Sequence, residues 1–155
     1  MTTSKATRYP LFALLYFTQG TVLGYFTALN ALYLLEHGVS LTKIGIFATI
    51  ALIPFVIKIL FGILSDKVNF WGLGHRKPYI LLGLAIQFLC LLLVPLVDPA
   101  TSYWGFVALA FTLQMGMALY DTCTDGLALD TTPEHEKGII QGLMVGGRAA
   151  GVMVA

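Results

Sequence analysis

Charged residues are scarce in this sequence. Only 11% of its 155 residues are Asp, Glu, Lys or Arg, whereas 57% are hydrophobic. A soluble domain typically has about 25% charged and 45–50% apolar residues, so this chain has less than half the usual charge. Its apolar residues also gather in runs that are long enough to cross a bilayer. The composition therefore predicts an integral membrane protein, not a soluble domain.

Several chemical signatures are also lacking. The net charge is only +1, which gives no basic patch for a nucleic acid. The two cysteines, Cys90 and Cys123, fall in separate apolar segments and have neither metal-ligand spacing nor a disulfide-rich context. The three histidines, His37, His75 and His135, fall in predicted loops. No nucleophile–base pair or phosphate-binding loop accompanies them. We therefore predict no enzyme activity, cofactor, metal site or nucleic-acid partner.

Five apolar segments are predicted to be membrane helices. A helix needs about 20 mostly apolar residues to cross the bilayer. The segments that meet or approach this length cover about 10–35, 44–64, 79–97, 104–129 and 138–155. The predicted fold class is therefore all-α, a polytopic membrane protein. Because the last segment is still apolar at Ala155, we expect residues 1–155 to form an N-terminal transmembrane domain that is incomplete at its C-terminus.

The positive charges of the short loops predict the orientation. Lysine and arginine are enriched in the cytoplasmic loops of membrane proteins. Only Lys43 falls on one side of the predicted helices, whereas six positive residues fall on the other: Lys5, Arg8, Lys67, Arg76, Lys77 and Lys137. We therefore expect a multi-pass protein of the cell membrane with a cytoplasmic N-terminus.

A charged motif follows the second predicted helix. Its first part contains Gly62, Asp66 and Lys67, and its second part contains Gly74, Arg76 and Lys77. Asp66 falls at the C-terminal end of its helix, where the helix dipole disfavours an anion. We therefore expect Asp66 to have a partner, either a cation or the N-terminus of another helix.

This motif resembles the cytoplasmic loop signature of the major facilitator superfamily. The chain departs from the pattern by about six inserted residues, Val68 to Leu73. The muropeptide permease, acetyl-CoA transporter and folate–biopterin transporter branches look similar here, and the sugar–cation symporter branch ends this loop in a similar way. The resemblance implies two six-helix halves around a midplane site. It also implies that Asp66 holds an inward gate by meeting a helix of the second half.

Polar side chains inside the predicted helices mark a candidate site. Asp121 and Asp125 are four residues apart and therefore share one helix face. Arg148 falls about ten residues into the last segment, at a depth close to that of Asp121. Such buried charges need partners, so Arg148 is expected to contact Asp121 or an anionic substrate. Lys58 either snorkels to the interface or faces a cavity, and Gln19 falls in the middle of the first helix.

Glycine spacing in the last segment predicts close helix packing. Gly142 and Gly146 form one pair of small residues four apart, and Gly147 and Gly151 form a second. Pairs with this spacing allow two membrane helices to approach closely.

The sequence favours a secondary active transporter. It would move a small polar, anionic solute through the lipid bilayer by alternating access. Asp121 or Asp125 could bind a coupling proton, because an apolar environment favours a neutral carboxyl. The missing C-terminal half would complete the site. A sugar–cation symporter, coupled to a proton or another cation, is the alternative within transport. A non-transporting membrane assembly factor is the alternative of another class, and it needs no buried charges.

Overall fold

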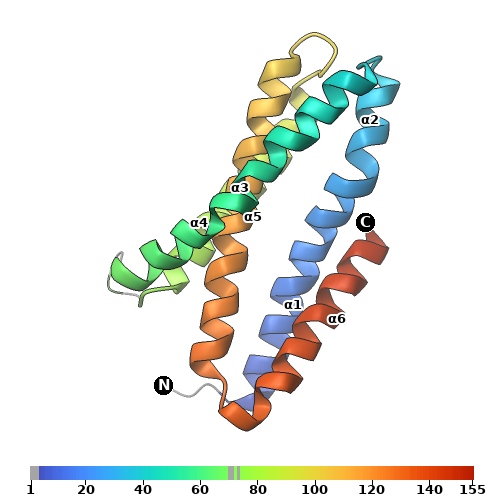
Figure 1. Cartoon of the computed structure of the whole chain (residues 1–155). Coiled ribbons are helices and arrows are strands. Elements are labelled where there is room, and N and C mark those ends of the chain that lie inside the picture. Colours follow the sequence, from blue (N-terminus) through green and yellow to red (C-terminus); the bar gives the residue numbers. More distant parts are fainter. Residues whose placement is uncertain (1–3, 70–71, 73) are drawn as a thin grey trace. The chain divides into compact units, whose positions relative to one another are not determined.

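The structure is a computed structural model that describes residues 4–69, 72 and 74–155. The described residues form helices and their connections, with no β-strand among them (Figure 1). The helices, in chain order, are α1 (Lys5–Gly24), the π-helical segment η1 (Tyr25–Leu29), α2 (Asn30–Glu36), α3 (Leu41–Lys67), α4 (Lys77–Leu93), the short 3-10 helix η2 (Val94–Leu96), α5 (Tyr103–Thr131), the 3-10 helix η3 (Glu134–Glu136) and α6 (Lys137–Val154).

Four helical stretches of the described chain are long and apolar enough to cross a membrane. They are Lys5–Glu36, Leu41–Lys67, Lys77–Leu96 and Tyr103–Thr131. The all-α fold with several apolar spans agrees with the sequence prediction. Helix α6 forms where the fifth span is expected, but it is not among the four. Arg148 and the glycines of α6 lower its hydropathy, so its crossing of the membrane stays a prediction.

The chain forms two compact units. The first unit consists of Met1–Asn30 and Thr124–Ala155, and the second consists of Ala31–Cys123. Helix α5 belongs to both, because the boundary falls after Cys123.

In the first unit, α1 and α6 lie side by side with their backbones in contact (Figure 1). A Cβ atom on Gly151 would lie 2.1 Å from the carbonyl oxygen of Phe17, and one on Gly147 would lie 2.4 Å from that of Ala13. On α1, a Cβ on Gly20 would lie 2.1 Å from the Arg148 carbonyl oxygen. Any side chain larger than hydrogen would therefore push the two helices apart.

The structure distinguishes the two glycine pairs of α6. Gly147 and Gly151 face α1, as close packing requires. A Cβ on Gly142 or Gly146 would meet nothing within 4 Å among the described residues. Gly142 and Gly146 have the same spacing but lie on a different face of α6, so they make no such contact with the described residues.

The second unit is held by glycine and aromatic contacts. A Cβ on Gly83 of α4 would lie 2.6 Å from the carbonyl oxygen of Gly116 on α5. The Phe106 ring stacks on Tyr33 and on Phe47, with ring centroids 5.9 and 5.7 Å apart. These contacts join α2, α3, α4 and α5 within the unit.

Candidate functional site

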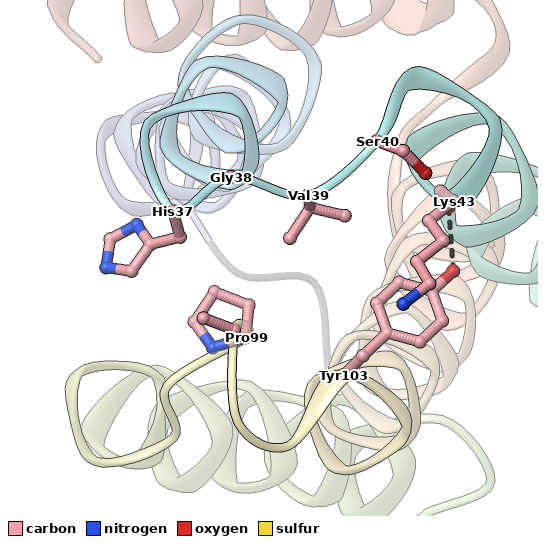
Figure 2. Close-up of a pocket in the computed structure, with 8 residues that line it drawn as sticks. His37, Gly38, Val39, Ser40, Lys43, Pro99 and Tyr103 are labelled. Atoms are coloured by element: carbon pink, nitrogen blue, oxygen red, sulfur yellow. Dashed lines mark hydrogen bonds between the residues drawn. The ribbon is translucent and has the colours of Figure 1, made fainter.

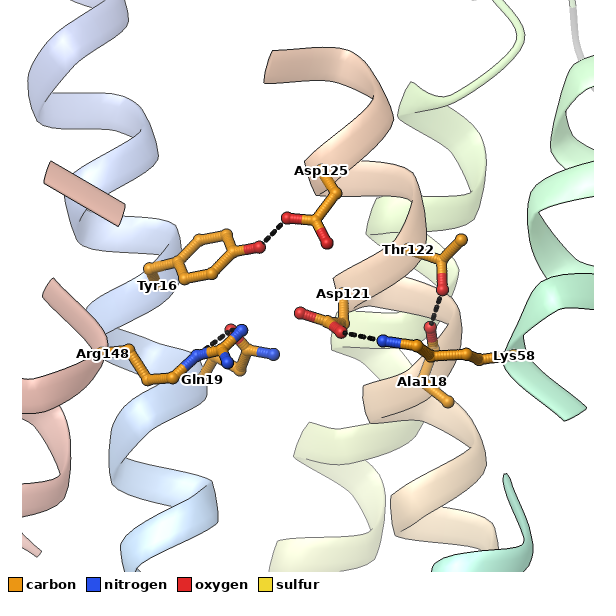
Figure 3. Close-up of polar contacts among 8 residues, drawn as sticks. All are labelled: Tyr16, Gln19, Lys58, Ala118, Asp121, Thr122, Asp125 and Arg148. Atoms are coloured by element: carbon orange, nitrogen blue, oxygen red, sulfur yellow. Dashed lines mark hydrogen bonds and ion pairs between the residues drawn. The ribbon is translucent and has the colours of Figure 1, made fainter. Parts of the chain in front are cut away.

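The Arg148 side chain of α6 lies against two residues of α1 (Figure 3). Its Nε and one terminal nitrogen donate hydrogen bonds to Oε1 of Gln19, at 3.2 and 2.9 Å. Its Cζ lies 4.8 Å from the centroid of the Tyr16 ring, which gives a cation–π contact. Gln19 is only 2% exposed. Two neutral groups of α1 therefore orient a positively charged fork within the first unit.

Tyr16 also contacts the carboxylate of Asp125 on α5. The Tyr16 hydroxyl donates a hydrogen bond to Oδ1 of Asp125 (Figure 3). A hydrogen bond to an ionised carboxylate is roughly twice as strong as one between neutral groups. The Tyr16 ring packs in a buried cluster that includes Phe12, Ile140 and Met144. One rigid side chain therefore touches both a carboxylate on α5 and a guanidinium on α6.

The second unit contains a partly buried ion pair. Nζ of Lys58 on α3 lies 3.3 Å from Oδ2 of Asp121 on α5, as Figure 3 shows. The Asp121 side chain is 5% exposed, whereas that of Lys58 is 40% exposed. A carboxylate at such a buried position is stable only with compensation, which the ammonium supplies. Contact between Asp121 and Arg148 stays a prediction.

The two parts of the charged loop motif meet. A terminal nitrogen of Arg76 lies 2.9 Å from Oδ1 of Asp66, and Asp66 itself is exposed. Lys67 is the last residue of α3, and Lys77 is the first of α4. Because Asp66 precedes the end of α3 by one residue, the Arg76 guanidinium offsets the unfavourable interaction of this carboxylate with the helix dipole.

The motif's glycines have different roles. Gly74 has a φ of 99°, in the left-handed region where glycine is preferred. A Cβ on Gly62 would lie 3.3 Å from Cγ2 of Thr122, so glycine there leaves room for α5. Of the inserted residues, Val68, Asn69 and Gly72 are described, whereas Phe70, Trp71 and Leu73 lie outside the described residues.

Glu136 forms a charged cluster that sequence reasoning missed. Its carboxylate contacts Lys5 and Arg8 of α1. Both the Glu136 and Arg8 side chains are only 3% exposed. Arg8 also donates a 3.1 Å hydrogen bond to the carbonyl oxygen of Thr131, at the end of α5. The hydrogen bond from the Lys5 ammonium holds the pKa of the Glu136 carboxyl below its ordinary value of 4.5.

Replacing Glu136 by glutamine should lower the thermal stability of the protein. Arg8 would remain buried without its carboxylate partner. Because the folded pKa of Glu136 lies below 4.5, its ion pairs stabilise the fold above that pH, and this contribution is lost as the pH falls through the folded value. Thermal unfolding in detergent across an acid pH series would measure both effects.

The matched control for this experiment is Glu134→Gln. The Glu134 side chain is 89% exposed and pairs with Lys137 at the surface. Exposed ion pairs contribute little, so this variant should retain the wild-type midpoint and acid profile. Equal midpoints and equal acid profiles in the two variants would show that the Glu136 cluster does not stabilise the fold.

A concavity of about 250 Å³ lies between two loops of the second unit (Figure 2). Its lining includes His37, Val39, Lys43, Pro99 and Tyr103. Nζ of Lys43 lies 5.3 Å from the Tyr103 ring centroid, and the Tyr103 hydroxyl donates a 2.7 Å hydrogen bond to the Lys43 carbonyl oxygen. These polar groups hold the start of α3 against the start of α5, which is a structural role.

Several apolar spans together with buried charged side chains define a multi-pass membrane protein whose helices carry polar groups inside the fold. The family model of the Major Facilitator Superfamily matches residues 2–155, and the chain therefore belongs to this superfamily. The chain is also similar to a Rickettsia conorii protein named "Putative transporter AmpG 4", with 26% identity over 129 residues. That match covers 80% of this chain but only 30% of the relative's length. No solved structure matches the chain significantly.

Proposed function

We propose that this chain provides part of the translocation pathway of a secondary active transporter for a small polar solute with an anionic group. Membership of the superfamily supports transport as the activity. The guanidinium of Arg148 supports an anionic solute, because an arginine fork binds a carboxylate or phosphate with two parallel hydrogen bonds. The solute would cross the membrane by alternating access around this group.

The contacts of Arg148 with Gln19 and Tyr16 are the observation that carries the proposal. Both contacts are with neutral groups that orient the guanidinium within the first unit. A neutral sugar has no charge that could pair with the guanidinium. An anionic solute is therefore favoured over the neutral substrate of a sugar–cation symporter. A non-transporting assembly factor would retain buried charges such as Asp121 without need, since each is costly inside a membrane protein.

Asp121 and Asp125 are the proposed proton sites. Asp121 is paired with Lys58, and Asp125 accepts the hydrogen bond of Tyr16. Protonation of either carboxylate would change the net charge near it by one unit. Coupling of this change to solute binding would allow a proton gradient to drive uptake.

Asp66 is the proposed gate residue, acting from the cytoplasmic end of α3. Its ion pair with Arg76 supports this role by keeping the carboxylate ordered at the helix end. Asp66→Asn should therefore reduce uptake with little change in expression, and uptake at the wild-type rate would exclude the gating role.

Uptake measurements in proteoliposomes test the proposed function. The protein that contains this chain, as its gene encodes it, would be reconstituted with an internal pH-sensitive dye. Gluconate and glucose form a matched pair of an acid and a neutral sugar, and lactate, phosphate and glucose 6-phosphate extend the anionic set. We expect an anion, but not glucose, to accumulate and to carry protons with it. Accumulation of glucose with no uptake of any anion would contradict the proposal.

Labelling of introduced cysteines tests the proposed orientation. Asn69 and Ser40 are both exposed and lie beyond opposite ends of α3. In a background that carries Cys90→Ala and Cys123→Ala, we expect Asn69→Cys to react only from the cytoplasmic side and Ser40→Cys only from outside. The reverse pattern would show that the N-terminus is not cytoplasmic.

A further inference from the structure

Tyr16 lies between the two charged groups of the first unit. Its hydroxyl contacts the Asp125 carboxylate of α5, and its ring face contacts the Arg148 guanidinium of α6 (Figure 3). Gln19, one turn further along α1, holds the same guanidinium from the side. We propose that Tyr16 is a positioning residue that transmits the protonation state of Asp125 to Arg148, and so makes proton binding and anion binding favour each other. The consequence for transport rests on the proposed function.

The hydrogen bond of Tyr16 depends on the charge of Asp125. The ionised carboxylate only accepts, so it holds the Tyr16 hydroxyl in a charge-assisted bond. A protonated Asp125 has a hydroxyl of its own to donate, and its bond with Tyr16 becomes a weaker bond between neutral groups. The Tyr16 ring is buried among Phe12, Ile140 and Met144. Because the hydroxyl is fixed to this closely packed ring, a shift of the hydroxyl also shifts the ring.

The ring position matters to Arg148. A cation is attracted to an aromatic face by the electron density of the ring, and the contact weakens when the face turns away. Protonation of Asp125 therefore loosens one contact of Arg148 and leaves its fork more available to an incoming anion.

The net charge of Asp125 and Arg148 also favours anion binding when Asp125 is protonated. Asp125 and Arg148 sum to zero when both are ionised and to +1 when Asp125 is protonated. Tyr16 and Gln19 from α1 are neutral, and Asp121, one turn earlier on α5, has the Lys58 ammonium as its partner. Proton binding therefore raises the affinity for an anion, and by linkage an anion raises the affinity for the proton.

An infrared titration tests this inference without any solute. The carboxyl stretching band of Asp125, assigned by its loss in Asp125→Asn, would be followed against pH in the wild type, Tyr16→Phe, Arg148→Gln and the double variant. Tyr16→Phe keeps the buried ring but removes the donor to the ionised carboxylate. We expect its titration midpoint to move upward by about one pH unit, since a hydrogen bond to a charged group has about this strength.

The double variant provides the decisive comparison. Arg148→Gln alone should also raise the midpoint, because a nearby cation favours the ionised carboxylate. If Tyr16 transmits between the two groups, Arg148→Gln should have at most about half of that effect in the Tyr16→Phe background, a non-additivity typical of coupled residues. Additive shifts, or an unchanged midpoint in Tyr16→Phe, would overturn the inference.

A control and a second readout separate this inference from the proposed function. Tyr33→Phe changes a half-buried tyrosine of the second unit and should leave the titration unchanged. Non-additive titration together with a failure of every anion to be transported would contradict the proposed function but not the role of Tyr16. Additive titration would contradict the role of Tyr16 even if an anion is transported.

Discussion

Replacing Arg148 by lysine is expected to reduce anion uptake about 100-fold while the protein still folds. Each hydrogen bond to a charged group contributes about 1.5–3 kcal/mol, and two decades of affinity correspond to about 3 kcal/mol. Lysine retains the charge but lacks the planar fork that Gln19 orients through two nitrogens. Transport kinetics of the reconstituted protein would measure the loss. Normal uptake would show that Arg148 does not bind the solute.

The control for this variant is Gln141→Ala, because Gln141 is an exposed polar residue of the same helix. Folded yield separates the two expected partners of Arg148. If Asp121 is the main partner, Arg148→Ala and Asp121→Ala should each lower the yield, and the double variant should recover part of it. If the solute is the main partner, Arg148→Ala should fold at the normal yield but transport poorly.

A second large effect is expected when Gly151 is replaced by alanine. The new Cβ would lie 2.1 Å from the Phe17 carbonyl oxygen, which cannot move without displacing the α1 backbone. Overpacking typically costs about 1–3 kcal/mol, and backbone contact places this site at the upper end. Because membrane helices associate mainly through close packing, α1 and α6 should separate. The thermal midpoint in detergent and the folded yield should both fall clearly.

Gly146→Ala is the matched control for that substitution. It makes the same chemical change on the same helix, at a position where a Cβ meets nothing within 4 Å among the described residues. Alanine also has a better intrinsic helix propensity than glycine, so this variant should be neutral or slightly more stable. Equal stability of Gly151→Ala and Gly146→Ala would show that the contact between α1 and α6 does not hold the first unit together.

Sequence periodicity and composition were sufficient to predict the helices, but they did not predict all of the contacts between them. The long apolar runs predicted the all-α fold, because lipid allows few alternatives to a helix. The glycine spacing of α6 predicted close packing but could not identify the pair involved. Gly142 with Gly146 has the same spacing as Gly147 with Gly151, and only the position of α1 distinguishes the two faces.

The candidate site could be predicted from the sequence only in part. The buried charges of Asp121 and Arg148 marked it, because charges inside apolar helices are costly. Tyr16 gave no such signal, since a tyrosine in an apolar helix is an ordinary core residue. Glu136 was missed for a different reason: in the sequence it is one acid of a short charged loop, and its partner Arg8 is 128 residues away. The neighbouring Lys137 helped to predict the side of the membrane, but nothing nearby in the sequence predicted the buried ion pair.

The glycine contacts between α1 and α6 also restrict how the first unit can move. Carbonyl oxygens of Ala13 and Phe17 occupy the spaces that missing side chains leave at Gly147 and Gly151. A slide of either helix by one turn, about 5.4 Å, would leave a glycine against one of those oxygens but bring a residue with a side chain against the other. In the proposed transport cycle, α1 and α6 should therefore move together as one rigid body. The backbones that carry Arg148 and its α1 partners would then keep a constant geometry. Opening to either side of the membrane would change what faces them, and within the unit only side chains such as that of Tyr16 would shift.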